Sequence, residues 1–168
     1  FNASERRANQ LQSLTRVSSI LTSSLKTEEL VVSLLDLLKL VIPFETATLW
    51  LRQGNNLTVA ATKGFEDDTS REGLTVDMED SAMFRDMVKA GEPISVMDVR
   101  NDRRFPALSE PAYLSWLGLP LIAKGQMIGL IAMEKREVDF YTHEYVNAAT
   151  TFASQAAVAL ENARLFEE

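Results

Sequence analysis

The chain has 168 residues, of which 46% are apolar and 24% charged, a composition typical of one ordinary globular domain. Seventeen basic and 24 acidic residues give a net charge of -7, which argues against a nucleic-acid backbone as partner. The chain contains no cysteine, which excludes disulfides, thiolate metal sites, cysteine nucleophiles and thioether-linked chromophores. The longest apolar stretch, residues 30–44, is interrupted by Asp36 and Lys39, so we expect no membrane span.

Two helices are predicted at the start of the chain. The second of these helices should begin at Thr27, a suitable N-cap, and stop at Pro43. The first helix carries a narrow stripe, with one apolar residue every three or four positions, as in a coiled-coil seam or a helix that meets a partner. The stripe consists of Leu11, Leu14, Val17, Leu21 and Leu25.

The middle of the chain is predicted to form strands and one short helix. Residues 46–52 and 57–63 flank the turn sequence QGNN and favour an antiparallel hairpin. The short helix has Asp80 or Ser81 as its cap and Gly91 as its left-handed stop. A short strand over residues 93–99, an irregular loop over 101–113 and a long hairpin over 113–136 follow.

The order of these elements predicts an α+β fold with an antiparallel sheet of five or six strands. The sequences LGLPLIA and IGLIAM are apolar at successive positions, so both faces of the sheet must be covered. We expect the terminal helices on one face. The short helix and the loops would then cover a small-molecule pocket on the other face.

The last helix is predicted to start near Thr142 and has no charged residue over residues 150–160. We expect it to be covered on more than one side, by its own domain and by a second copy of the chain. Two terminal glutamates would sit unfavourably at a true helix end, so we expect the helix to continue in a larger protein. Small side chains would let it lie close to the sheet and the first helix, with Phe152 and Leu160 as the larger contacts. The small residues are Ala149, Ala153, Ala156, Ala157 and Ala163.

Several segments together resemble the GAF domain family. The hairpin LSWLGLPLIAKGQMIGLIAME, the loop VMDVRNDRRFP and the ending FASQAAVALENARLFEE are similar to the corresponding family segments. The resemblance covers residues 27–168, and we assign residues 1–26 to an N-terminal signalling or dimerisation helix. It implies a sensory or regulatory domain of a larger signalling protein, such as a histidine kinase or a cyclic-di-nucleotide enzyme, with a separate output domain.

The cysteine-dependent members of the family can be excluded. Bilin attachment and free methionine sulfoxide reduction both require cysteine, so no covalent bilin is possible and the cofactor stays unknown. Cyclic-nucleotide-binding members carry Asn-Lys, a gap, Phe, three residues and Asp-Glu. The run EKREVDFYTHEY keeps Lys135 and Phe140, places Glu144 at the Asp position, and lacks the rest. An ion pair between Lys135 and Glu144 could pin the last strand to the last helix.

No catalytic constellation is visible in the sequence. His143 is the single histidine and is interpreted as a solvated residue of the first helical turn. The acidic run 66–68 lacks the spacing and glycine of a calcium loop. Asp98 and Asp102 could bind the donors of a ligand, although short acids in loops more often bond their own backbone. We therefore expect neither an enzyme nor a metal site.

Aromatic residues are the better guide to a ligand. We expect them around the pocket, where they could stack on a planar molecule or fill the core themselves. The favoured function is a non-catalytic small-molecule sensor that signals through its terminal helices as a homodimer. The alternatives are a ligand-free dimerisation module and a cyclic-nucleotide-binding domain with a degenerate motif, and a cytoplasmic location is expected for each. The candidate ligand-binding residues are Trp50, Phe84, Asp98, Phe105, Tyr113 and Trp116.

Overall fold

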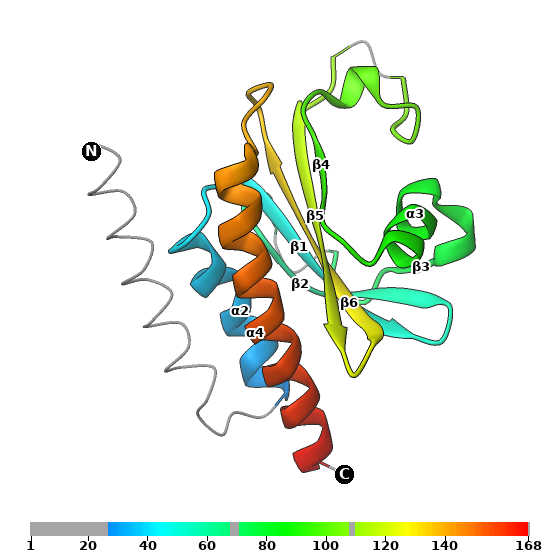
Figure 1. Ribbon diagram of the computed structural model, residues 1–168, viewed down its shortest axis with the longest axis vertical. Coiled ribbons are helices and arrows are strands. Elements are labelled where there is room, and N and C mark those ends of the chain that lie inside the picture. The colour runs from blue at the N-terminus through cyan, green and yellow to red at the C-terminus, as the bar shows by residue number, and fades with distance from the viewer. Residues whose placement is uncertain (1–26, 68–70, 108–109, 168) are drawn as a thin grey trace.

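The fold is a single six-stranded antiparallel sheet between two unequal layers (Figure 1). The computed structural model of the chain describes residues 27–67, 71–107 and 110–167. The strand order is β3-β2-β1-β6-β5-β4. Helices α2 and α4 lie together on one face, and α3 lies on the other (Figure 1). This arrangement confirms the predicted α+β fold; the helix predicted within residues 1–26 lies outside the described part.

The elements follow the predicted order, with one strand and two short 3-10 turns added. The sequence analysis missed β3 because its three residues include two exposed ones and show no apolar alternation. The helices are α2 (Thr27–Lys39), α3 (Ala82–Ala90) and α4 (His143–Glu167). The strands are β1 (Thr46–Gln53), β2 (Asn56–Lys63), β3 (Thr75–Asp77), β4 (Ile94–Val96), β5 (Ser115–Ala123) and β6 (Gln126–Lys135). The turns are η1 (Met78–Asp80) and η2 (Val99–Asn101).

The predicted turn and cap residues act as expected. The Ser81 side chain accepts a hydrogen bond from the Phe84 backbone N–H at 3.3 Å and so caps α3. Gly91 ends α3 in the left-handed conformation, with φ of 65°. Lys124 and Gly125 both have positive φ, 53° and 75°, which is the geometry of a tight turn matching the strand twist between β5 and β6.

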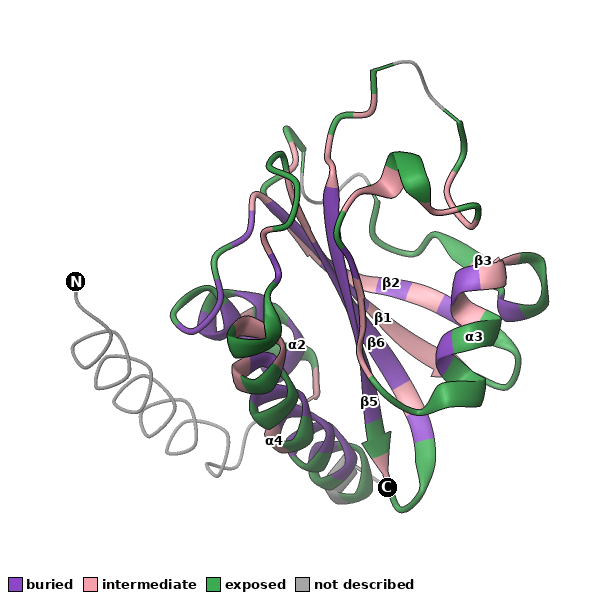
Figure 2. Ribbon diagram, turned by 45° about the horizontal axis from the view of Figure 1, so that its top comes forward, coloured by how far each residue is buried: buried purple, intermediate pink, exposed green. Residues whose placement is uncertain are grey.

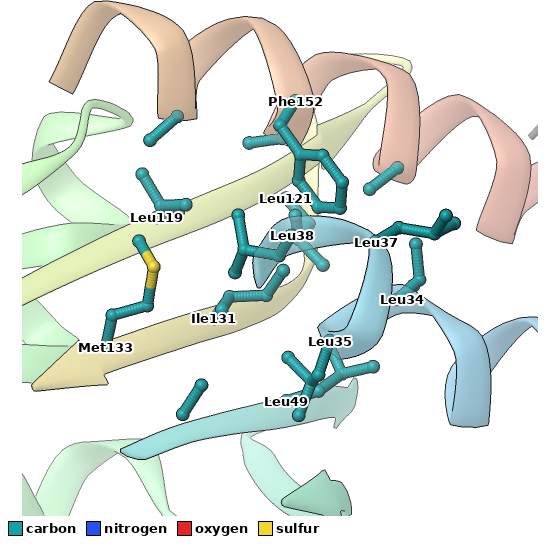
Figure 3. Packing of buried hydrophobic residues seen from close by; sticks show 14 of the residues in the cluster. Leu34, Leu35, Leu37, Leu38, Leu49, Leu119, Leu121, Ile131, Met133 and Phe152 are labelled. Atoms are coloured by element: carbon teal, nitrogen blue, oxygen red, sulfur yellow. The ribbon is translucent and has the colours of Figure 1, made fainter. Parts of the chain in front are cut away.

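The helix-side face of the sheet holds the larger core. Phe152 of α4 and Leu34 and Leu38 of α2 are fully buried against strands β1, β5 and β6. Figure 3 shows Phe152 reaching from α4 toward leucines of α2 and β5. The predicted small residues of α4 are buried, which lets this helix pack closely on β5 and on α2. Those residues are Ala149, Ala153, Ala156, Ala157 and Ala163.

The opposite face holds a second core cluster beneath α3. It consists mainly of methionine and aromatic side chains, whereas the helix-side core is mainly aliphatic. Strand β5, next to the edge strand β4, is buried from Ser115 to Leu121, so it is covered on both faces (Figure 2). Within the described residues, no helix combines the length and apolar composition of a membrane span. The buried members of this second cluster are Leu57, Met78, Met83, Met87, Val96, Trp116, Met127, Leu130 and Ala132.

Candidate ligand-binding face

Four of the five candidate aromatic residues lie together on the α3-side face. Trp50 of β1 meets Phe84 of α3 edge-to-face, with ring centroids 5.5 Å apart. Phe105 of the long loop meets Trp116 of β5 in the same way at 5.6 Å. Each contact is worth about 0.5–1.5 kcal/mol beyond area burial. The aromatic residues of this face therefore stabilise two joints, one between the sheet and α3 and one between the sheet and the loop.

The Trp116 indole lies over Gly118, its neighbour two residues along β5. A Cβ atom added at Gly118 would come within 2.3 Å of the Trp116 ring and 2.4 Å of the Met87 methyl group. Trp116 is 7% exposed. Because Gly118 has no side chain, the Trp116 ring can pack directly on the backbone at this position. Met87 of α3 packs at the same place.

Methionines make this face adaptable. Met83 and Met87 of α3 are buried in the second cluster together with Met78 and Met127. Methionine side chains have three rotatable bonds and a polarizable sulfur, so they can repack around a guest at low cost. An Arg104–Asp86 ion pair at 3.1 Å adds a polar link between the long loop and α3. The layer that covers this face, made of α3 and the adjoining loops, is therefore smaller than the helix-side layer and packs through more flexible side chains. We call it the soft cover.

Tyr113 and Asp98 lie outside this cluster. Tyr113 is half-buried in the loop before β5 and belongs to neither core cluster. Asp98 caps η2, and its carboxylate accepts hydrogen bonds from two side-chain nitrogens of Arg100, Nε at 2.9 Å and Nη2 at 2.7 Å. The Arg100 guanidinium bonded to Asp98 holds the pKa of that carboxyl below its usual range. Its carboxylate thus serves the local turn, which is the structural interpretation considered from the sequence.

Asp102 repeats the same local arrangement four residues later. Its carboxylate accepts hydrogen bonds from Arg104 Nε at 2.9 Å and Nη2 at 2.6 Å. These bonds hold the pKa of the Asp102 carboxyl below its usual range. Both aspartates therefore stay ionised and engaged, and the loop after β4 is built from two Asp-x-Arg turns.

An open cavity of about 410 Å³ lies at the edge of the sheet, beside β4. Its wall includes Asp98, Asp102 and Asp139, together with backbone of the segment that leads into α4. The Ser115 hydroxyl lies between these two segments: it accepts from the Phe140 N–H at 3.1 Å, donates to the Glu137 carbonyl at 2.5 Å, and lies 3.3 Å from the Met97 carbonyl after β4. None of the candidate aromatic residues lines this cavity. The cavity is therefore distinct from the aromatic face.

A polar row crosses the aromatic face. Thr46 of β1 and Trp116 of β5 are the direct cross-strand partners of Glu134 in β6. Because alternate residues of a strand share a face, Glu134 lies on the same face as Leu130 and Ala132 of the second cluster. Directly opposite residues have Cβ atoms about 4.5–5.5 Å apart, so the three side chains are neighbours. Neither Thr46 nor Glu134 is among the ligand-binding residues predicted from the sequence.

Two members of this row lack polar partners. Thr46 is fully buried, and its hydroxyl makes no hydrogen bond within the described part of the chain. The Glu134 carboxylate makes neither a hydrogen bond nor an ion pair with any described residue. Burial raises the pKa of the Glu134 carboxyl, and the Arg71 guanidinium offsets part of that rise. Buried polar groups without partners are costly, so this row needs an explanation.

The positions of the degenerate cyclic-nucleotide motif form a structural contact. Lys135 forms ion pairs with Glu45 at 3.3 Å and Glu137 at 3.7 Å, and lies over the Phe140 ring at 4.6 Å. The predicted Lys135–Glu144 ion pair is therefore wrong, because Lys135 at the end of β6 meets the residue before β1 instead. Glu144 is exposed in the first turn of α4, next to an exposed His143.

The described residues contain no group of three or more potential metal-ligating side chains. The six-stranded sheet of this order has paired helices on one face and a short helix on the other, which is a layered α+β architecture. A family model described as "GAF domain" matches residues 24–161, and the chain belongs to that family. A comparison with curated proteins gives no match.

Solved structures support the fold. The GAF domain of a phosphoenolpyruvate-protein phosphotransferase from Coxiella burnetii matches with a TM-score of 0.81 at 19% identity, over 95% of this chain and 97% of that chain. Free methionine-R-sulfoxide reductase from Neisseria meningitidis, solved with its substrate, matches with a TM-score of 0.79 at 16% identity, over 99% and 96%. A GAF domain/HD domain protein from Geobacter sulfurreducens gives 0.72 at 18% identity, over 89% and 99%. At these identities the likeness shows the fold alone.

The polar row predicts a pH-dependent effect of Glu134→Gln on stability. A carboxyl whose pKa is raised by folding binds its proton more tightly when folded, so the fold loses stability as pH rises from the ordinary glutamate pKa through the raised one. The glutamine variant has no charge to bury. We expect it to exceed the parent's free energy of unfolding at pH 7 by on the order of 1 kcal/mol, and to show no gain near pH 3.5.

Urea unfolding at the two pH values measures this difference. Glu92→Gln is the matched control, because Glu92 is exposed in the turn after α3 and the change in charge is the same. We expect the control to show no pH-dependent gain. A Glu134→Gln variant that is less stable than the parent at pH 7 would contradict the description of Glu134 as unpartnered.

Proposed function

We propose that the chain is a non-catalytic regulatory module that binds a small molecule between the sheet and α3 and acts within a larger signalling protein. The observation that carries this proposal is the contrast between the two faces of one sheet. Aliphatic side chains and two helices seal one face, whereas methionines, aromatic rings and one nine-residue helix cover the other. A soft cover over aromatic rings and unpartnered polar groups suits a ligand that enters and leaves.

A non-catalytic role is supported by the chemistry that the chain offers. The sequence has no cysteine, and its one histidine is exposed at the start of α4, away from the second cluster. The ionised aspartates of the loop after β4 are engaged by their own arginines. Binding and shape change therefore account for these residues better than proton transfer or nucleophilic attack does.

The central strands provide a route from the ligand face to the helices. Trp116 belongs to the second cluster, while the adjacent Leu117 is fully buried in the helix-side cluster beneath α4. A ligand that displaces the Trp116 indole would shift β5 and so the surface on which α4 rests. The interior is close-packed, so such a shift would be passed on rather than absorbed. We propose that α2 and α4 carry this shift to an output domain of the parent protein.

A second candidate function, a structural module that binds nothing, is favoured by one observation. The aromatic rings already contact one another, and Trp116 is 7% exposed. In that case the second cluster is simply core. The cyclic-nucleotide alternative finds less support, because Lys135 is already engaged by the Glu45 carboxylate and by the Phe140 ring.

Native mass spectrometry of the purified chain, before and after denaturation, separates these functions. The sensor proposal predicts a co-purified small molecule that adds a constant mass to the folded chain and is released on unfolding. Trp116→Leu should lose this mass, because it removes the ring against which the molecule packs. Phe152→Leu, a matched change in the helix-side cluster, should keep it. A parent chain that never carries or takes up a small molecule from a metabolite mixture would favour the structural module.

A homodimer through the terminal helices is the second part of the proposal. Val158 and Leu165, seven residues apart on α4, are 56% and 45% exposed. Apolar side chains repeated at this spacing suit a seam between two helices. Light scattering should give about twice the 18.7 kDa of one chain. The double change Val158→Glu with Leu165→Glu should halve that mass, since it places like charges in the seam.

The matched control for the dimer is Leu74→Glu. Leu74 is 55% exposed and precedes β3. This edge strand is separated by three strands from β5, on which α4 packs. This variant should remain dimeric. If the unsubstituted chain is monomeric at all concentrations tested, signalling through paired terminal helices is contradicted.

A further inference from the structure

The row formed by Thr46, Glu134 and Trp116 combines two features that are seldom found together. Thr46 is 0% exposed and its hydroxyl has no hydrogen-bond partner among the described residues. Beside it, Glu134 presents a partly buried carboxylate that no described residue pairs. An unsatisfied buried hydroxyl and an unpaired carboxylate each cost free energy, so packing alone does not explain them.

The register places these two groups on one spot. Thr46 and Glu134 are direct partners across β1 and β6, and Glu134 and Trp116 are direct partners across β6 and β5. All three lie on the α3-side face, because their neighbours Ala47, Met133 and Leu117 belong to the helix-side cluster. The spot thus offers two oxygen-bearing side chains, one of which is the direct cross-strand partner of Trp116.

The charged groups near the spot are the Glu134 carboxylate and the Arg71 guanidinium. Arg71 is the cation that acts electrostatically on Glu134, and its guanidinium stacks on the Phe65 ring at 4.1 Å. Lys135, the next residue in the chain, belongs to the opposite face by strand alternation and pairs with Glu45 and Glu137. A cationic donor from outside would therefore meet a carboxylate that has no hydrogen bond or ion pair in the described structure, with Arg71 as the competing cation at longer range.

We propose that Thr46 and Glu134 form the polar anchor of the ligand site, and that the site takes a small organic molecule carrying an amine or amidine beside an apolar ring. The nitrogen would donate to the Glu134 carboxylate and the Thr46 hydroxyl, and the ring would pack on Trp116 and the methionines above it. A charge-assisted hydrogen bond of this kind is stronger than a neutral one and would set the specificity. The inference rests on the proposed function, because it assumes that this face receives a ligand.

The test uses two probes of matched size, 2-phenylethylamine and 3-phenylpropionate. Binding is followed by NMR at the indole N–H signals, of which the chain has two, from Trp50 and Trp116. The parent chain should bind the amine about tenfold or more tightly than the carboxylate. Glu134→Gln should abolish this preference, and Thr46→Val, which keeps the side-chain shape, should weaken amine binding by about threefold to tenfold. Glu92→Gln should leave the preference unchanged.

The outcomes distinguish the anchor from the proposed function. Equal or tighter binding of 3-phenylpropionate would overturn the anchor but keep the ligand face, because the Trp116 signal would still respond. An amine preference that survives Glu134→Gln would also overturn the anchor. If neither probe shifts the Trp116 signal at millimolar concentration, the anchor would fall; the ligand-binding function would fall with it only if native mass spectrometry also finds no bound small molecule.

Discussion

The rest of the structure depends on one constraint, which is that the central strands are apolar on both faces. β5 is buried at every residue from Ser115 to Leu121. An antiparallel sheet usually has one face in water, but here each face must be covered by another part of the chain. The covers are drawn from opposite parts of the sequence: α2 and α4 for one face, and the middle segment with α3 for the other. The layered fold follows from this requirement.

The two covers are unequal, and the proposed function rests on this difference. The helix-side layer is long and aliphatic, and alanines on α4 bring its backbone close to the sheet. The α3-side layer is a nine-residue helix whose buried contacts are Met83 and Met87. Such a cover can open or repack at lower free energy than a two-helix layer. The unpartnered Thr46 and Glu134 lie on this softer side, where a ligand could satisfy them.

Local chemistry predicted much of this fold, and tertiary pairing decided the rest. Ser81 and Gly91 were identified as the ends of α3 because capping needs particular residue types. β3 was missed because it is short and carries no pattern. Glu134 was not selected from the sequence, because only the register of β6 with β1 and β5 places it between Thr46 and Trp116. The partners of Lys135 were wrongly predicted for the same reason, since they come from distant segments.

Amide hydrogen exchange across the chain tests most directly whether α3 is a separately opening cover. We expect the amides of α3 to exchange through a local opening. The free energy of this opening should be clearly lower than that for the amides of α4 over residues 149–160 and of the buried strand β5. Exchange of α3 would then be nearly insensitive to low concentrations of denaturant. If α3 amides instead exchange only with global unfolding, at the same free energy as β5, the two covers are equivalent and the ligand-face account is wrong.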